Sequence, residues 1–125
     1  MNQKILKKER IRKKEEIKSI LNKKRTREGI NFRLYFSPND LGFSRMAILT
    51  GKKIGKATKR NRVKRLFREA FRKNKYLFKD GLDILIIPKN SVSEKKYQEI
   101  EKDFIEVIKP LIRNSNNSLL NHPYC

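Results

Sequence analysis

The sequence predicts one small domain that mixes helices with strands. Its 125 residues suit a single domain, and 37% hydrophobic residues suffice for one core. Apolar residues recur with helical spacing in some segments and alternate in others, so both kinds of element are expected. We assign residues 1–113 to the domain. Residues 114–125, rich in Asn and Ser, are expected to be a disordered tail.

The first half of the chain predicts one helix followed by two strands. Ile17, Ile20 and Leu21 have the i, i+3, i+4 spacing of a short amphipathic helix that ends near the basic run 23–27. Residues 31–37 alternate between apolar and polar side chains, as in a strand with one buried face. A turn at 38–42 leads to a second strand over 44–50, antiparallel to the first if the turn is a hairpin.

The second half predicts a helix, a central strand and a final helix. The first of these helices carries a continuous apolar stripe, formed by Val63, Leu66, Phe67, Ala70 and Phe71. In residues 83–87, Asp83 is followed by four apolar residues and the run is closed by a proline, which is typical of a central strand. The final helix has inward-facing positions from 97 to 111, and Pro110 is expected to kink or end it.

The charge of the chain is large and one-sided. Lys and Arg number 33 against 13 Asp and Glu; residues 1–80 hold 27 basic and 7 acidic residues, and residues 81–125 hold 6 of each. A field of this kind attracts polyanions. Nucleic acid is therefore the expected partner, which fits a ribosomal or DNA-architectural protein as well, and an anionic membrane surface is the weaker alternative.

The charge is densest between residues 52 and 73, which hold eleven basic residues and one acidic residue. An ordinary solvated helix can be basic, but here Arg predominates on the helix, and its planar guanidinium binds phosphate through two donors. A glycine-containing loop leads into the same helix and adds backbone N–H donors. The predicted RNA-binding residues are Lys52, Lys53, Lys56, Arg60, Asn61, Arg62, Lys64, Arg65, Arg68 and Arg72.

The sequence shows no arrangement of residues typical of an NTPase, a metal site or a nuclease. The loop from Gly51 to Thr58 has three residues between its glycines instead of four, and Ala57 where an NTPase needs Ser or Thr for magnesium. The carboxylates are scattered and the single histidine, His122, lies in the tail, so neither a metal site nor a nuclease centre is expected. No signal-peptide pattern is present and Cys125 is the single cysteine, which together favour a reducing, cytoplasmic setting and no membrane.

The stretch from Lys52 to Phe71 resembles the signature of the ribonuclease P protein component, K-x-G-K-A-x-x-R-N-x-x-K-R-x-x-R-E. The matching residues are Lys53, Gly55, Lys56, Ala57, Arg60, Asn61, Lys64, Arg65, Arg68 and Glu69. The resemblance implies an α+β fold, a compact sandwich in which helices pack on a mixed, mostly antiparallel sheet. It also implies a left-handed crossover around the basic helix, where general rules predict a right-handed one.

The same resemblance implies a function. The protein would bind the catalytic RNA one to one and bind the 5′ leader of precursor tRNA, while the RNA performs the chemistry with its own magnesium ions. No catalytic residue or bound cofactor is expected in the protein. The leader cleft would include Ile17, Leu21, Arg33 and Tyr35. Because Ile17 and Leu21 stand where the family usually has aromatic rings, Tyr35 is expected to supply much of the stacking there.

Overall fold

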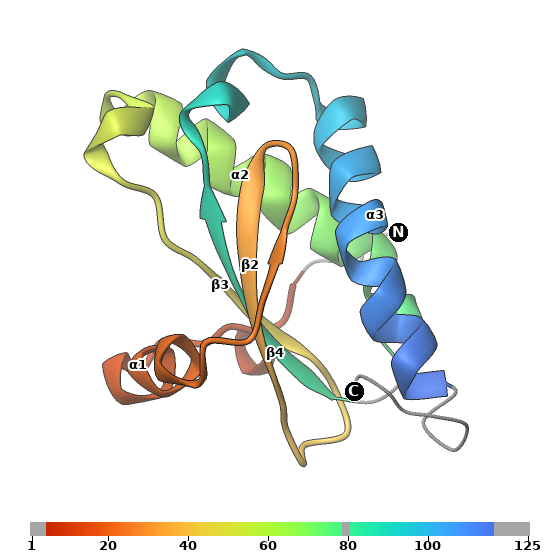
Figure 1. Cartoon of the computed structure of the whole chain (residues 1–125). Helices are drawn as coiled ribbons and strands as arrows, with labels where there is room; N and C mark the ends of the chain where they lie inside the picture. The colour runs from red at the N-terminus through yellow and green to blue at the C-terminus, as the bar shows by residue number, and fades with distance from the viewer. Residues whose placement is uncertain (1–4, 79–80, 117–125) are drawn as a thin grey trace.

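The structure is a computed structural model that describes residues 5–78 and 81–116, with side chains as far as Leu111. Three α-helices and four strands form the body of the fold (Figure 1). The helices are α1 (Lys14–Lys23), α2 (Ala57–Asn74) and α3 (Tyr97–Asn116). The strands are β1 (Thr26–Glu28), β2 (Phe32–Pro38), β3 (Arg45–Ile48) and β4 (Leu82–Pro88). Four short 3-10 turns are η1 (Lys7–Glu9), η2 (Lys52–Ile54), η3 (Lys75–Leu77) and η4 (Asn90–Glu94).

The sheet has the order β1-β2-β4-β3, which corrects the expected pairing of the second strand. β3 does not form a hairpin with β2. It pairs with β4 in parallel, and β4 lies between the two as the antiparallel partner of β2. The physical reason is that β4 is apolar on both faces, so it takes the central position and is buried almost throughout.

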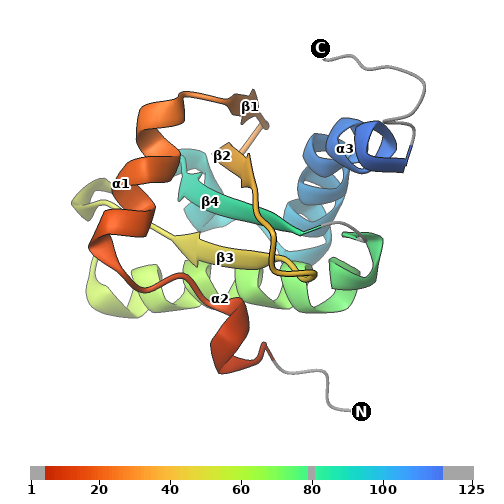
Figure 2. The ribbon, with the colours of Figure 1, turned by 90° about the horizontal axis from the view of Figure 1, so that it is seen from below.

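Helices cover both faces of the sheet, as expected for the α+β sandwich. Figure 2 shows α1 on one side of the sheet and α2 on the other. With the parallel strands β3 and β4 running upward, α2 lies behind the sheet and β4 lies to the right of β3. The β3–α2–β4 crossover is therefore left-handed (Figures 1 and 2). The main core lies between the sheet and the pair α2 and α3, and its rings Phe32, Phe67 and Phe104 are fully buried.

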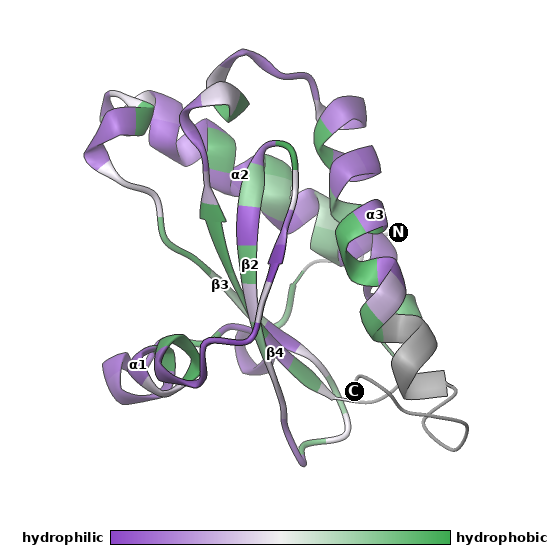
Figure 3. Cartoon of the chain, viewed as in Figure 1, coloured by the Kyte–Doolittle hydropathy of each residue, from purple (hydrophilic) through white to green (hydrophobic). Residues whose placement is uncertain are grey.

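The opposite face of the sheet carries a smaller cluster beneath α1. Ile11, Ile20, Ala47 and Leu85 are its buried members. The helix ends at Lys24, whose φ of 55° places it in the left-handed region. The hydrophobic sides of α2 and α3 face the sheet and their polar sides face outward (Figure 3), so the apolar stripes are used by the core. This leaves no exposed stripe on α2 to anchor the chain in a membrane surface.

Other boundaries differ in detail from the sequence-based expectations. β1 was not predicted, because three exposed residues in a basic run carry no apolar signal. The final helix continues through Pro110 to Asn116, past the expected domain boundary at 113. The remainder of the expected tail, 117–125, lies outside the described residues. No helix in the described part of the chain is long and apolar enough to cross a membrane.

Candidate nucleic-acid interface

A glycine-containing loop presents lysines at the start of α2. Ile54 is buried and anchors the loop, while Lys52, Lys53 and Lys56 are exposed around it. Gly55 has a φ of 131°, a conformation that side-chain-bearing residues rarely adopt. Lys56 precedes the helix without a side-chain cap, so the first N–H groups of α2 have no side-chain acceptor there. The loop thus combines free backbone donors with three ammonium groups, a combination suited to phosphate.

The predicted RNA-binding residues of α2 divide into two groups according to their partners. Arg60, Arg62 and Arg72 are engaged within the protein. The Arg60 guanidinium donates to the Gly55 carbonyl at 2.8 Å, and that of Arg62 donates to the Lys95 carbonyl at 3.0 Å. The Arg72 guanidinium pairs with Glu69, which raises the pKa of Arg72 and lowers that of Glu69. These three residues therefore have a structural role in the free protein.

The second group has no partner among the described residues. Its members are Lys52, Lys53, Lys56, Asn61, Lys64, Arg65 and Arg68. On the helix, Asn61, Lys64, Arg65 and Arg68 follow one another at steps of one to three residues and lie on the side away from the buried stripe of Val63, Phe67 and Ala70. The unpaired cations therefore lie in the loop that leads into α2 and along the outer side of that helix.

Arg68 also borders a hollow of about 210 Å³ between α1, β3 and α2, where it meets two arginines from the N-terminal segment. Arg10 and Arg12 line the hollow together with Arg68, and Ile17 and Leu49 contribute apolar wall. Burial, reinforced by the charge of Arg10, lowers the pKa of Arg68. Like charges gathered in a partly desolvated hollow repel one another, and an anion would relieve this cost.

Arg10 and Arg12 were not among the predicted site residues. They flank the buried Ile11, whose N–H donates to the Met46 carbonyl at 2.9 Å, and Arg10 forms a parallel bridge with Met46. The segment thus lies along the outer edge of β3 with its arginines exposed. The alternation of Arg, Ile and Arg was visible in the sequence, but nothing there indicated that it lies beside Arg68.

The four predicted cleft residues are not all together. Ile17, Leu21 and Tyr35 pack against the cluster beneath α1, so the expected grouping of these three is present. Tyr35 is half-buried there and does not line the hollow beside Ile17. Arg33 is exposed near the β1 edge, where it pairs with Glu28 at 2.9 Å. Phe32 and Leu34 point into the main core, and Phe36 packs against it, as strand alternation predicted.

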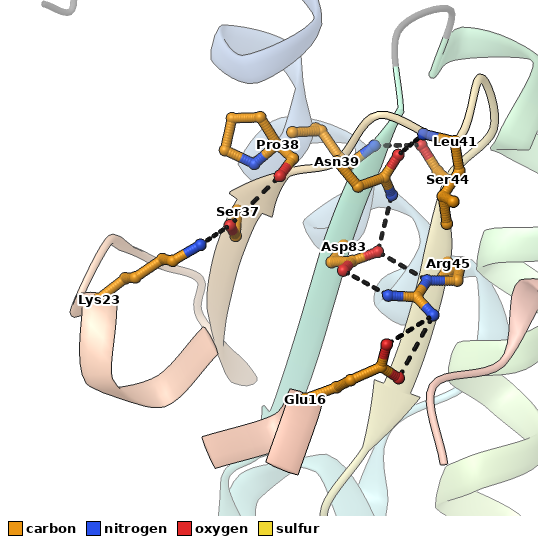
Figure 4. Close-up of polar contacts among 10 residues, drawn as sticks. Glu16, Lys23, Ser37, Pro38, Asn39, Leu41, Ser44, Arg45 and Asp83 are labelled. Carbon is orange, nitrogen blue, oxygen red and sulfur yellow. Dashed lines mark hydrogen bonds and ion pairs between the residues drawn. The ribbon is translucent and has the colours of Figure 1, made fainter. Parts of the chain in front are cut away.

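Polar ties hold α1 over this face of the sheet (Figure 4). Near the start of the helix, the Glu16 carboxylate accepts from the Arg45 guanidinium at 3.3 Å, and Arg45 in turn binds Asp83. Near its end, the Lys23 ammonium donates to the Ser37 hydroxyl at 2.9 Å. These contacts fix the position of Ile17 relative to β3 and hence the shape of the hollow.

The described residues include no group of three or more His, Cys, Asp or Glu side chains that could hold a metal ion. The site offers donors and positive charge, and its chemistry is that of phosphate binding.

Comparison with known proteins finds matches that share one description. Residues 5–111 match the family model described as Ribonuclease P. The chain is 45% identical over 94 residues to the ribonuclease P protein component of Syntrophus aciditrophicus, covering 75% of this chain and 79% of that protein. The solved structure of the Thermotoga maritima RNase P protein superposes with a TM-score of 0.75 at 31% identity, over 82% of this chain and 96% of that one. The Staphylococcus aureus RNase P protein gives a TM-score of 0.75 at 27% identity, over 82% and 94% of the two chains.

Proposed function

The chain belongs to the ribonuclease P protein family, the protein subunits of a ribonucleoprotein that matures the 5′ ends of tRNA, and on that premise we propose which RNA each part of its surface binds. The lysine loop and the outer face of α2 bind the catalytic RNA, with one protein per RNA. The hollow between α1, β3 and α2 receives the 5′ leader of precursor tRNA. The protein acts in the cytoplasm and binds no cofactor of its own.

The observation that carries this proposal is the set of cations without partners around α2. Three other arginines do have such partners: Arg33, Arg45 and Arg72 pair with carboxylates. Lys64, Arg65 and Arg68 have no such partner among the described residues. Adjacent cations without partners repel one another, which lowers the stability of the fold. A polyanion that binds them removes this repulsion, and the release of its counterions favours binding further.

Arg68 lies where the surface assigned to the catalytic RNA meets the hollow assigned to the leader of precursor tRNA. It lies on the α2 face and also lines the hollow with Arg10 and Arg12. A leader running through the hollow would place its phosphates against these guanidinium groups and its bases against the apolar wall at Ile17 and Leu49. The protein would then join substrate and catalytic RNA by reducing the repulsion between their backbones, which raises affinity more than it speeds the chemical step.

We assign the hydrolysis to the RNA. Metal-assisted phosphoryl transfer uses clustered carboxylates to hold the ions, and the described residues offer no such cluster. Magnesium would be bound through the RNA. The protein contributes binding and orientation.

Reconstitution tests the proposal directly. The full chain is combined with a bacterial ribonuclease P RNA and 5′-labelled precursor tRNA at low magnesium, and cleavage at the mature 5′ end is followed. We expect cleavage only when the RNA is present, and stronger binding of precursor than of mature tRNA in the presence of protein. Reproducible cleavage by RNA-free protein would contradict the accessory role. Equal affinity for precursor and mature tRNA would contradict the leader site.

A further inference from the structure

A second hollow, of about 380 Å³, lies at the far end of α2 from the lysine loop. Three aromatic rings line it: Phe43 from the segment before β3, and Tyr76 and Phe78 from the segment after α2. Phe78 is buried and connects the hollow to the main core. Tyr76 is 71% exposed, whereas the rings of Phe32, Phe67 and Phe104 in the core are fully buried. An exposed ring beside a hollow offers a flat face for stacking.

Cations slightly outnumber carboxylates around this hollow. Arg72 and Lys75 line it, and each is paired with a carboxylate, Arg72 with Glu69 and Lys75 with Glu9. The Lys8 ammonium lies 4.6 Å from the centroid of the Phe43 ring, within the range of a cation–π contact. The Lys75 ammonium is held by Glu9 at 3.1 Å, which fixes its position at the rim. Proteins that bind single-stranded nucleic acid combine aromatic rings with neighbouring cations in this way.

The hollow continues the surface already assigned to the catalytic RNA. Arg65, Arg68, Arg72 and Tyr76 follow one another at intervals of three or four residues, so they lie along one side of α2 and its η3 extension. α2 has 18 residues and is therefore about 27 Å long, which separates the hollow from the lysine loop by the length of several nucleotides.

We propose that the hollow formed by Phe43, Tyr76 and Phe78 binds an unpaired base of the catalytic RNA, with Tyr76 as the stacking ring. The proposal rests on the function assigned to the α2 face. The catalytic RNA is chosen over the leader because the hollow continues that face, whereas the leader hollow lies between α1, β3 and α2 and is lined by other residues, Ile17 and Leu49 among them. The protein would thus contact the catalytic RNA at both ends of α2, through phosphates at one end and through a base at the other.

Binding of the full-length chain to a bacterial ribonuclease P RNA, measured over a range of salt concentrations, tests the proposal. Tyr76→Ala removes an exposed ring, so the fold should survive; Tyr76→Phe retains the ring. Ile30→Ala is the matched control, because Ile30 is 76% exposed but lies in the β1–β2 turn. Phe43→Leu removes a second ring and keeps an apolar, smaller side chain. Thermal unfolding and circular dichroism establish that each variant is folded.

We expect Tyr76→Ala to weaken binding about fivefold or more, the loss expected for one stacked base. Its log–log salt dependence should stay unchanged, because no phosphate contact is removed. Tyr76→Phe and Ile30→Ala should bind like the wild type, and Phe43→Leu should lose part of the affinity.

Equal affinity of Tyr76→Ala and Ile30→Ala would overturn the proposal. So would a loss in Tyr76→Phe as large as in Tyr76→Ala, because the hydroxyl and not the ring would then be responsible. If Tyr76→Ala bound the catalytic RNA like the wild type and weakened only the binding of precursor tRNA to the reconstituted ribonucleoprotein, the hollow would belong to the substrate and the proposal would be wrong. These outcomes leave the wider function intact, whereas a wild-type chain that does not bind the catalytic RNA would refute both.

Discussion

Arg45 and Asp83 face each other across the parallel pair β3 and β4 and join through two hydrogen bonds. The Arg45 Nε donates to Asp83 Oδ1 at 2.9 Å and the Nη2 to Oδ2 at 2.7 Å (Figure 4). This bidentate contact raises the pKa of Arg45. The Asn39 side-chain amide donates to the same carboxylate at 2.7 Å. Because the remaining Arg45 nitrogen reaches Glu16 on α1, the pair connects the sheet to the helix that borders the hollow between α1, β3 and α2.

Glu16→Gln should reduce the preference for precursor over mature tRNA severalfold. The substitution weakens the tie between α1 and β3, so Ile17 is held less firmly in the wall of the hollow, while Arg45 keeps Asp83 as a partner. The Glu16 side chain is 37% exposed, so the change in stability should be small, below about 1 kcal/mol. Affinities for both tRNAs, measured with the reconstituted ribonucleoprotein, give the ratio.

Glu15→Gln is the control for Glu16→Gln, because Glu15 is an exposed neighbour on the same helix and the change in net charge is identical. The two variants should gain equally in general affinity for RNA and differ only in the precursor-to-mature ratio. Identical ratios would show that the Glu16 tie does not position the leader site.

Replacing both Arg65 and Arg68 by Ala should weaken binding to the catalytic RNA and flatten its salt dependence by about one to two units of log–log slope. These residues lack partners within the described part of the protein, so their charge is available to phosphates. The control is Lys102→Ala with Lys109→Ala on α3, which removes the same charge from the charge-balanced third of the chain. Equal losses in the two double variants would favour diffuse attraction over a localised face.

Ile17→Phe should increase the affinity for precursor tRNA up to about tenfold, because a ring in the wall of the hollow can stack on a leader base. Mature tRNA, which has no leader, should bind as before. The control Ile105→Phe places the same ring on α3, at a half-buried position away from the hollow. An equal gain in affinity for mature tRNA would show that the added ring increases non-specific binding to RNA and does not contact the leader.

Asp103→Ala should destabilise the fold by about 2–3 kcal/mol and lower the melting temperature by about 10 °C. Asp103 on α3 is buried and its two oxygens accept from the backbone N–H groups of Ile30 and Asn31, at 2.9 and 2.7 Å. Its removal leaves both donors unsatisfied. Glu106→Ala removes the same charge from an exposed position on the same helix and should change the melting temperature little. Equal shifts would mean that the charge matters and not the two hydrogen bonds.

The amino-acid sequence determined the elements with strong periodicity and the type of partner. The apolar stripe of α2, with Val63 and Phe67, and the continuous apolar strand β4 are found where spacing predicted them. The side assignments of Phe32 and Leu34 also followed from alternation. Periodicity reports local geometry, and net charge adds up whatever the fold, so both can be read along a chain.

The tertiary structure alone decided which cations are available and which are already used. Arg62 and Arg65 look alike in the sequence, but the guanidinium of Arg62 donates to backbone carbonyls before α3, and Arg65 has no partner among the described residues. Arg10 and Arg68, separated by 57 intervening residues, meet at one hollow because the N-terminal segment lies along the edge of β3. The pairing of β3 with β4 was likewise decided by long-range burial, since a strand apolar on both faces has to lie at the centre of the sheet. Such contacts depend on distances in space, which the order of residues along the chain does not specify.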